Sequence, residues 1–249
     1  MMPRTVICLP TYNERENLPL LVAEVHRVVP HVDILVIDDN SPDGTGRLAD
    51  ELAAADARVH VLHRQQKQGL GRAYLAGFAW ALAHDYALIF EMDCDFSHPP
   101  RFLPEFLRQA EHFDVVLGSR YIAGGGTQDW DWRRRLISRG GNTYAQVILG
   151  LPFKDLTGGF KCFHRRVLEA LPLDEIVSNG YVFQIELTWR CVQLGFTVGE
   201  VPIQFPDRTR GQSKMTGDIV AEAVTRVWRL RLDRRRMRVR RAGPSPQAT

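Results

Sequence analysis

Short apolar runs alternate with stretches of helical periodicity along the first half of the 249-residue chain. Apolar runs that end in polar or glycine residues, as buried strands do, occupy residues 5–9, 34–37, 59–63, 87–92 and 115–118. Apolar residues recur at helical spacing over residues 18–29, 45–55, 70–83 and 102–112. This repetition of strand and helix with short connections predicts an α/β fold, in which helices flank a mostly parallel sheet.

The pattern loosens beyond residue 121. A glycine-rich loop at 124–127 precedes a helical pattern over 133–149, which opens with three arginines. The remaining segments are a mixture of apolar residues and glycines at 155–163, a helical pattern at 183–194, a strand pattern at 198–205, a polar basic loop at 208–216 and a helical pattern at 219–232. We expect one domain over residues 1–232, followed by a basic and flexible tail at 233–249.

The charge of the chain is polarised. The formal net charge is only +3, but residues 226–249 contain nine arginines and one acid, a charge of +8, and the rest of the chain carries −5. A basic end of this kind typically meets phosphates on lipids or nucleic acids. Because neither an interleaving of aromatic residues with these arginines nor a recognised binding motif supports it, we expect no nucleic-acid partner.

The composition is that of an ordinary soluble globular protein, with 45% hydrophobic and 24% charged residues. No apolar stretch approaches the ~18 residues of a spanning helix, and the apolar N-terminal run is too short for a signal peptide. Cys8, Cys94, Cys162 and Cys191 form no CxxC pair, which predicts buried thiols in a reducing compartment. We therefore expect a cytoplasmic protein.

Acidic residues follow two of the predicted strands, where α/β proteins collect their ligands. Asp93 and Asp95, at positions i and i+2, aim two carboxylates at one point if the chain bends there, and such oxygens suit Mg²⁺ or Mn²⁺. The alternative is that this pair caps the helix at 102–112, but His98-Pro99-Pro100 separates it from that helix. Asp38 and Asp39 are placed to meet a ribose or base, or alternatively to cap the helix after Gly44.

The usual phosphate-binding motifs are missing from the sequence. No GxGxxG follows the first strand, and no GxxxxGK[ST] occurs. Phosphates would therefore be held by a metal and by basic side chains, for which the candidates are Lys67, Arg120, Arg133, Arg134, Arg208, Arg210 and Lys214. Lys214 lies in a polar loop that is suited to close over a diphosphate as a lid, or alternatively is only solvated.

Eight motifs in order carry a resemblance to a known family. They are PTYNE, VIDDNSPDGT, DCDFSHPP, GSRY, WRRRLISRG, DLTGGFK, GYVFQIE and RTRGQSK, and they extend from about residue 6 to about residue 215. The chain resembles the dolichol-phosphate (polyprenol-phosphate) mannosyltransferases, which are family-2 inverting glycosyltransferases with the Rossmann-like A-type fold. The first three motifs are shared by many family-2 enzymes, whereas the later ones are more specific to polyprenyl-phosphate sugar synthases.

The resemblance implies a nucleotide-sugar half, about residues 1–120. It assigns the guanosine to Pro10, Tyr12, Glu14, Ile37 and Asp39, with Lys67 in a loop that approaches it. Asp93 and Asp95 would hold Mg²⁺ or Mn²⁺ on the diphosphate, with Cys94 between them. Ser97 stands where some members place a metal-coordinating Gln, and a hydroxyl is a weaker ligand. Arg208 and Lys214 would bind the donor diphosphate.

The resemblance implies an acceptor half, about residues 121–232, with C-terminal helices on the acceptor side. Arg120, Arg134 and Ser138 would hold the acceptor phosphate, and Asp155 and Gln184 are candidates for the sugar pocket. The reaction implied is transfer of mannose from GDP-mannose to a polyprenyl phosphate with inversion. Asp95, Arg120 and Lys214 would be the catalytic residues. A phosphate monoester, with a second pKa near ~6, is already ionised and needs no general base.

The last predicted helix places Val224, Trp228 and Leu232 on one apolar stripe among arginines. We expect this helix and the tail to dock on the cytoplasmic face of a membrane; alternatively, Val224 and Trp228 pack on the body. Some family members need a small membrane-embedded partner, and nothing in the sequence indicates whether this protein needs one. The alternative functions are a UDP-glucose-dependent polyprenyl-phosphate glucosyltransferase, a non-catalytic nucleotide-sugar-binding protein, and a nucleotidyltransferase, whose glycine-rich N-terminal loop is missing.

Overall fold

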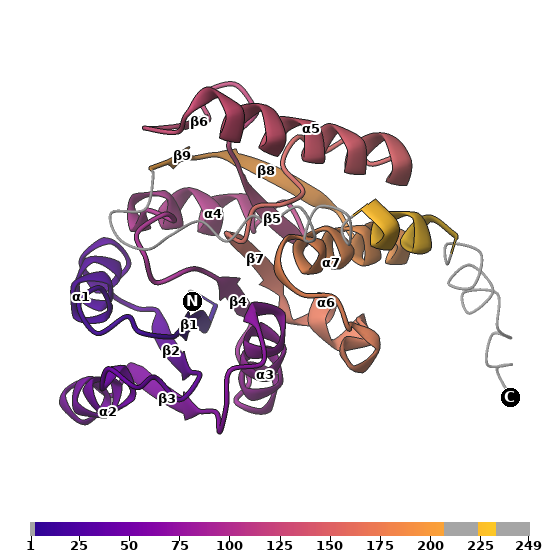
Figure 1. Cartoon of the computed structure of the whole chain (residues 1–249). Coiled ribbons are helices and arrows are strands. Elements are labelled where there is room, and N and C mark those ends of the chain that lie inside the picture. Colours follow the sequence, from indigo (N-terminus) through magenta and orange to yellow (C-terminus); the bar gives the residue numbers. More distant parts are fainter. Residues whose placement is uncertain (1–2, 207–223, 233–249) are drawn as a thin grey trace, which may run out of the picture.

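A seven-stranded sheet with the order β3-β2-β1-β4-β7-β5-β8 forms the centre of the molecule (Figure 1). The computed structural model describes residues 3–206 and 224–232. The five strands expected in the first half are confirmed as β1 (Thr5–Thr11), β2 (Asp33–Asp38), β3 (Val59–His63), β4 (Leu88–Glu91) and β5 (Val115–Ser119). They run in one direction, as predicted, together with β8 (Val198–Pro202).

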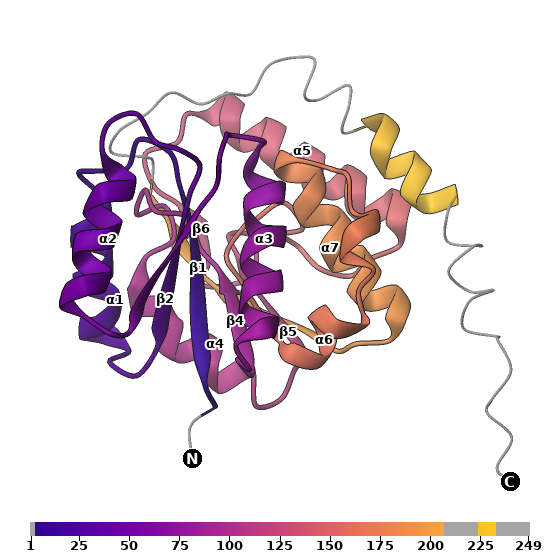
Figure 2. The ribbon, with the colours of Figure 1, turned by 90° about the horizontal axis from the view of Figure 1, so that it is seen from below.

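Helices cover both faces of this sheet (Figure 2). Along β1 the side chains alternate, so Ile7 and Leu9 pack with α1 and α4 on one face, while Val6 and Cys8 pack with α3, α6 and α7 on the other. The helices are α1 (Leu18–Val28), α2 (Thr45–Ala55), α3 (Leu70–Ala83), α4 (Leu103–Gln109), α5 (Trp132–Leu149), α6 (Arg165–Ala170) and α7 (Gly180–Leu194). The predicted mostly parallel, helix-flanked sheet is confirmed.

Proline contributes to two of the differences between the predicted and the observed elements. The helix expected at 102–112 is a 3₁₀ turn, Pro100–Phe102, followed by α4, because Pro104 suits only the first turn of an α-helix. The strand expected at 198–205 divides into β8 and β9 (Gln204–Phe205), which pairs with β6 (Gly126–Thr127). Pro202 ends β8 because it has no N–H for the sheet.

The strand β7 (Lys161–His164) was not predicted. It lies between β4 and β5 and is antiparallel to both. Because it runs the opposite way, its N-terminal end lies at the edge where the parallel strands have their carboxyl ends. The segment before β7, residues 155–160, is therefore delivered to that edge.

The four cysteines are free and buried, as predicted. Within the described ranges, no helix combines the length and the hydropathy needed to cross a bilayer.

The described part of the last predicted helix, residues 224–232, packs against α5 and α7. Val227 and Leu230 are buried in a cluster with Ala145, Leu149, Ile185 and Trp189. The predicted stripe of Val224, Trp228 and Leu232 is exposed, although the Val224 carbonyl accepts a hydrogen bond from the Tyr144 hydroxyl of α5 at 3.1 Å. The helix therefore packs on the body chiefly through Val227 and Leu230, and its docking on a membrane stays a prediction. Residues 219–223 and the tail at 233–249 lie outside the described residues.

Candidate active site

The carboxyl ends of the parallel strands bring most of the predicted site residues to one edge of the sheet. Tyr12 follows β1, Asp39 follows β2, Asp93 follows β4, and Arg120 follows β5. The register places Thr11 of β1 beside Asp38 of β2, so the loops after these two strands lie together. This edge is where open α/β sheets hold their ligands.

The acidic pair after β4 has the geometry of a cation site. Asp93 and Asp95 are both partly exposed, while Cys94 between them is buried in the core. The two carboxylates therefore lie on the solvent side of the chain. Asp95 Oδ1 accepts a hydrogen bond from the Ser97 backbone N–H at 3.0 Å. This carboxylate is therefore bound to its own loop and does not cap a helix. The capping alternative is not observed, because α4 begins after Phe102 without a side-chain cap.

Two aromatic residues that the sequence did not single out hold Asp93. The Tyr74 hydroxyl donates to Asp93 Oδ1 at 3.0 Å, and burial, followed by the charge of Asp93, raises the pKa of Tyr74 well above its usual value. His98 Nδ1 accepts the Asp93 backbone N–H at 2.9 Å, which leaves the proton on Nε2, 4.0 Å from Asp93 Oδ2. Tyr74 and His98 thus orient the first carboxylate of the pair.

The donor set fits a cation that takes its remaining ligands from a substrate. Among the described residues no cluster of three or more His, Cys, Asp and Glu side chains is placed to hold a metal alone. Two carboxylates with substrate phosphates are a typical magnesium arrangement. Ser97 is fully buried, and its hydroxyl has no hydrogen-bond partner in the described structure. Its backbone supports Asp95, and its role as a ligand stays a prediction.

The loops after β1 and β2 form the predicted nucleoside end. The Glu14 N–H donates to Thr45 Oγ1 at 3.0 Å, which ties these loops together. The Lys67 ammonium lies 3.5 Å from the centroid of the Tyr12 ring, so the predicted loop lysine does approach this end. Pro10 is half-buried. Ile37 and Cys94 are buried in the core, so only their backbones are available to a nucleotide.

Asp38 and Asp39 have separate partners, and neither caps α2. Asp38 accepts from the hydroxyls of Thr11 and Ser41, and so closes its own loop. Asp39 pairs with Arg64. Burial raises the pKa of Asp39, although the charge of Arg64 opposes this. Arg64 follows β3 directly. The search for charged residues after the other predicted strands, if extended to this one, would have identified it as a candidate.

The three predicted acceptor-phosphate residues line one pocket of about 280 Å³. Arg134 and Ser138 come from successive turns of α5, and Arg120 follows β5. The Trp130 ring holds the two arginines together, with the guanidinium carbons of Arg134 at 3.9 Å and Arg120 at 5.5 Å from its centroid. The rest of the lining is largely apolar and comes from α5, α7 and helix 224–232. Arg133, also a phosphate candidate, is exposed and does not line the pocket.

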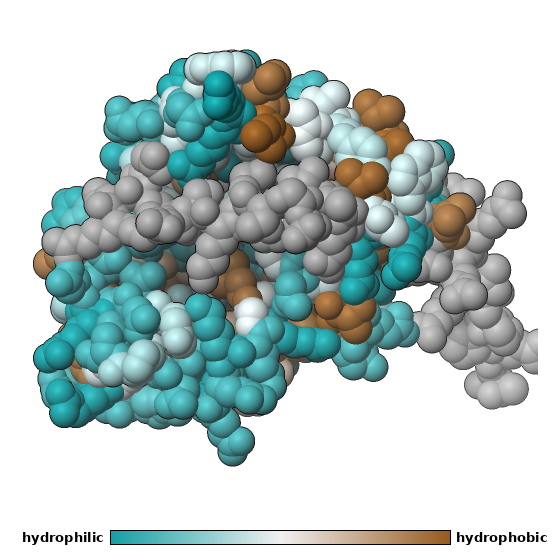
Figure 3. Space-filling model, in the orientation of Figure 1, coloured by the Kyte–Doolittle hydropathy of each residue, from teal (hydrophilic) through white to brown (hydrophobic). Residues whose placement is uncertain are grey.

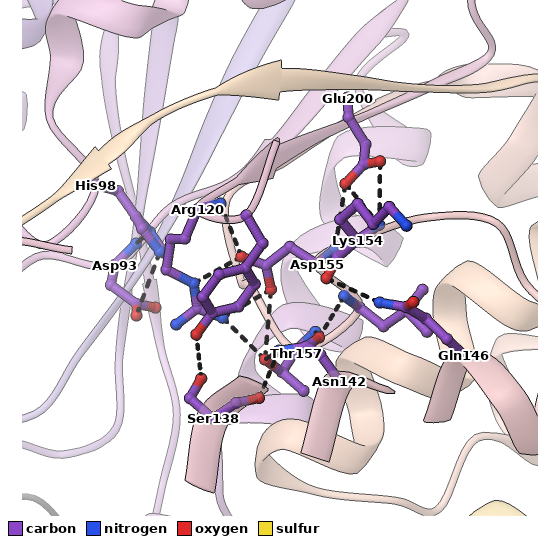
Figure 4. Close-up of polar contacts among 12 residues, drawn as sticks. Asp93, His98, Arg120, Ser138, Asn142, Gln146, Lys154, Asp155, Thr157 and Glu200 are labelled. Carbon is purple, nitrogen blue, oxygen red and sulfur yellow. Dashed lines mark hydrogen bonds and ion pairs between the residues drawn. The ribbon is translucent and has the colours of Figure 1, made fainter. Parts of the chain in front are cut away.

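A buried ion pair joins this pocket to the segment before β7 (Figure 4). Arg120 Nε and Nη2 donate to the two Asp155 carboxylate oxygens at 2.6 and 2.7 Å, and Nη2 also donates to Thr157 at 2.8 Å. Burial disfavours both charges, but their attraction prevails, so the pKa of Arg120 is raised and that of Asp155 lowered. Asp155, predicted for the sugar pocket, therefore positions Arg120.

Two further buried ionisable groups, an acid and a base, lie on neighbouring strands of the sheet. Glu91 on β4 faces Lys161 on β7 in register, and the Lys161 ammonium donates to the Gln184 carbonyl at 2.7 Å and to Thr188 at 3.0 Å. Burial raises the pKa of Glu91 to about 8 and lowers that of Lys161 to about 8. The Gln184 side chain, predicted for the sugar pocket, is buried near His98, since both lie within 3.5 Å of the Cβ position of Gly159.

Replacing Lys161 with Met is expected to make stability fall as the pH rises. The folded pKa of Glu91 already exceeds its unfolded value of about 4.3 and should rise further without the cation. A raised folded pKa gives stability that is complete below the unfolded pKa and is lost as the pH rises through the folded pKa, by up to about 1.4 kcal/mol per pH unit. Urea unfolding of Lys161→Met and of Glu91→Gln/Lys161→Met at pH 5, 7 and 8.5 measures this. The prediction would be contradicted if the free energies of unfolding of the two variants changed with pH to the same extent.

Arg208 and Lys214, predicted to bind the donor diphosphate, lie outside the described residues, as does Arg210.

Comparison with known proteins identifies the class. The model of "Glycosyl transferase family 2" matches residues 6–171. The polyprenol monophosphomannose synthase of Mycolicibacterium smegmatis is 52% identical over 243 residues, covering 95% of this chain and 92% of that protein. The undecaprenyl-phosphate mannosyltransferase of Micrococcus luteus is 47% identical over 226 residues, covering 91% of this chain and 93% of that protein.

A solved structure supports the same fold. Glucosyl-3-phosphoglycerate synthase from Mycobacterium tuberculosis, in complex with Mn²⁺, uridine diphosphate and phosphoglyceric acid, matches with a TM-score of 0.65 at 18% identity, covering 93% of this chain and 78% of that chain. The fold is that of an A-type glycosyltransferase. The chain belongs to glycosyl transferase family 2, and its resemblance to the polyprenyl-phosphate mannosyltransferases is confirmed.

Proposed function

We propose that the protein transfers mannose from GDP-mannose to a polyprenyl phosphate with inversion, giving polyprenyl β-mannosyl phosphate and GDP. The observation that carries this proposal is the pocket in which Arg120, Arg134 and Ser138 accompany a largely apolar lining. A phosphate joined to a hydrocarbon chain matches both parts of that lining. The names of the two relatives support the same sugar and the same class of acceptor.

In the proposed reaction an oxygen of the acceptor phosphate attacks the anomeric carbon of mannose. The bond from that carbon to the diphosphate breaks, and GDP leaves with the bonding electrons. Because the acceptor is already ionised near neutral pH, no side chain needs to remove a proton. The described residues that line the pocket include no acid, which fits an acceptor of this kind.

Asp93 and Asp95 are the proposed ligands of Mg²⁺ or Mn²⁺, with Ser97 as a weaker candidate. When bound, the cation supplies positive charge that stabilises the leaving diphosphate. Tyr74 and His98 keep the Asp93 carboxylate oriented for this role. Pro10, Tyr12, Glu14, Ile37, Asp39 and Lys67 remain the proposed contacts of the guanosine. Arg208 and Lys214 remain the proposed contacts of the diphosphate.

The donor is decided by a transfer assay with the full chain. Purified protein is incubated with polyprenyl phosphate, Mn²⁺ and either labelled GDP-mannose or labelled UDP-glucose, and butanol-extractable label is counted. We expect transfer from GDP-mannose. Transfer from UDP-glucose alone would refute the donor assignment, and no transfer from either would favour a non-catalytic nucleotide-sugar-binding protein.

We propose further that the protein docks peripherally on the cytoplasmic face of an anionic membrane, where its lipid acceptor lies. Apolar side chains gather over α5 and over helix 224–232 on one face of the molecule (Figure 3). Trp228 and Leu232 are 48% and 70% exposed, and Trp132 on α5 is 68% exposed. Arginines accompany them in both helices, as expected for a surface that meets anionic lipid.

Replacing Trp228 and Leu232 together with Gln is expected to weaken binding to phosphatidylglycerol vesicles by roughly tenfold or more, because both apolar side chains lose burial in the lipid. Co-sedimentation of the full chain measures this binding. Leu20→Gln is the matched control, since Leu20 is 62% exposed on α1, a helix that lies apart from α5 and helix 224–232 (Figure 1). Equal binding by both variants would refute docking through this helix.

A further inference from the structure

Helix α5 presents three different faces. Asn142, Ala145 and Leu149 are buried in the protein, whereas Trp132, Leu136 and Val147 are exposed on the outside. Between these faces, a third set lines the 280 Å³ pocket: Arg134, Ile137, Ser138, Gly140, Gly141 and Tyr144. One helix thus contributes to the core, the outer surface and the proposed acceptor pocket.

Gly140 and Gly141 lie in the middle of this pocket-lining face, and nothing in the described part of the chain requires glycine at either position. Neither has a positive φ, so the backbone does not require glycine there. A Cβ added at either position would meet no atom of the described residues within 4 Å, so packing among these residues does not require glycine. Two adjacent glycines also weaken a helix interior relative to alanine. What the missing side chains leave is open space in the pocket.

The position of the glycines along α5 indicates what that space would hold. An α-helix rises 1.5 Å per residue, so Gly141 lies roughly 4–5 Å beyond Ser138 and roughly 10 Å beyond Arg134, along the helix axis. The lining becomes apolar in that direction, with Tyr144, Ile185 and Val227. An occupant whose phosphate contacts Arg120, Arg134 and Ser138 therefore passes its chain over the two glycines.

We propose that Gly140 and Gly141 form the floor for the first isoprene units of the acceptor and so select an acceptor with a hydrocarbon chain next to its phosphate. This inference rests on the proposed polyprenyl-phosphate acceptor. It assigns to α5 two successive functions, phosphate binding in its first turns and chain binding in its middle. A side chain at position 141 fills the space that the chain needs while leaving the phosphate contacts in place.

The test compares Gly141→Ala and Gly141→Leu with Thr143→Leu, which adds volume to the same helix at an exposed position outside the pocket. Affinities for a ten-carbon prenyl phosphate and for inorganic phosphate are measured by calorimetry. We expect the prenyl phosphate to bind at least tenfold more weakly to Gly141→Leu, with Gly141→Ala intermediate. Inorganic phosphate should bind all variants as it binds the wild type, and Thr143→Leu should behave as wild type towards both ligands.

Two further readouts separate the explanations. Gly141→Ala should raise Tm by about 2–4 °C, since alanine favours the helix, so weaker binding is not caused by unfolding. Unchanged prenyl-phosphate affinity in Gly141→Leu would overturn the inference. If Gly141→Ala bound neither the prenyl phosphate nor inorganic phosphate, the inference would also be overturned, and a hinge in α5 would be indicated. If the wild type transfers no mannose to polyprenyl phosphate, the proposed function itself fails, independently of these affinities.

Discussion

Replacing Asp95 with Asn is expected to reduce mannose transfer by roughly 10²–10³-fold while leaving the fold intact. The variant removes one of the two carboxylates proposed to hold the cation, and with it charge stabilisation of the leaving diphosphate. The fold should persist because the Asn carbonyl oxygen still accepts the Ser97 N–H bond that orders this loop. Initial rates with saturating GDP-mannose and Mn²⁺, together with Tm, measure both effects.

Asp85→Asn is the matched control for this prediction. Asp85 is exposed just after α3, at a positive φ that Asn also accepts, and it lies at the opposite edge of the sheet. We expect wild-type rate and stability for the control. Full activity of Asp95→Asn across a titration of Mn²⁺ would refute the assignment of the cation to this pair.

Replacing Asp155 with Ala is expected to lower the free energy of unfolding by roughly 3–5 kcal/mol, because Arg120 stays buried without its counterion. The same variant should lose acceptor binding, since Asp155 fixes the orientation of the Arg120 guanidinium that lines the pocket. Urea unfolding near pH 7.5 and titration with a short prenyl phosphate measure the two consequences.

Two companion variants isolate the buried charge as the cause. Arg120→Met/Asp155→Ala should be more stable than Asp155→Ala alone, because no uncompensated charge remains. Glu105→Ala breaks the exposed pair with Arg108 and should cost less than about 1 kcal/mol. A loss for Asp155→Ala no larger than that for Glu105→Ala would show that the pair contributes little.

Residues that depend on local pattern were predictable from the sequence. The five strands and the helices of the first half follow from periodicity, and α3 begins and ends where its pattern does. The alternation that buries Cys94 and leaves Asp93 and Asp95 towards solvent also follows from neighbouring positions. The joint lining of one pocket by Arg120, Arg134 and Ser138 agrees with the family resemblance.

Features that depend on distant contacts were not predictable in the same way. β7 has four residues, and its pairing is set by β4 and β5 on either side. Tyr74 looks like a core residue of α3 until the fold brings its hydroxyl to Asp93. His98 looked like a spacer before a helix, yet its ring accepts the Asp93 N–H. Each of these roles requires a partner that is remote in sequence or a loop bend that periodicity does not encode.

The antiparallel strand β7 also sets the distance between the ends of β4 and β5. Neighbouring strands are about 4.8 Å apart, so one inserted strand separates the ends of β4 and β5 by roughly 10 Å. Asp93 stands at one end of that interval and Arg120 at the other. If these residues hold the donor diphosphate and the acceptor phosphate, the width of a single strand sets the gap that the sugar must bridge. A different acceptor is then accommodated by changing α5 and the loops, with the spacing kept by the sheet.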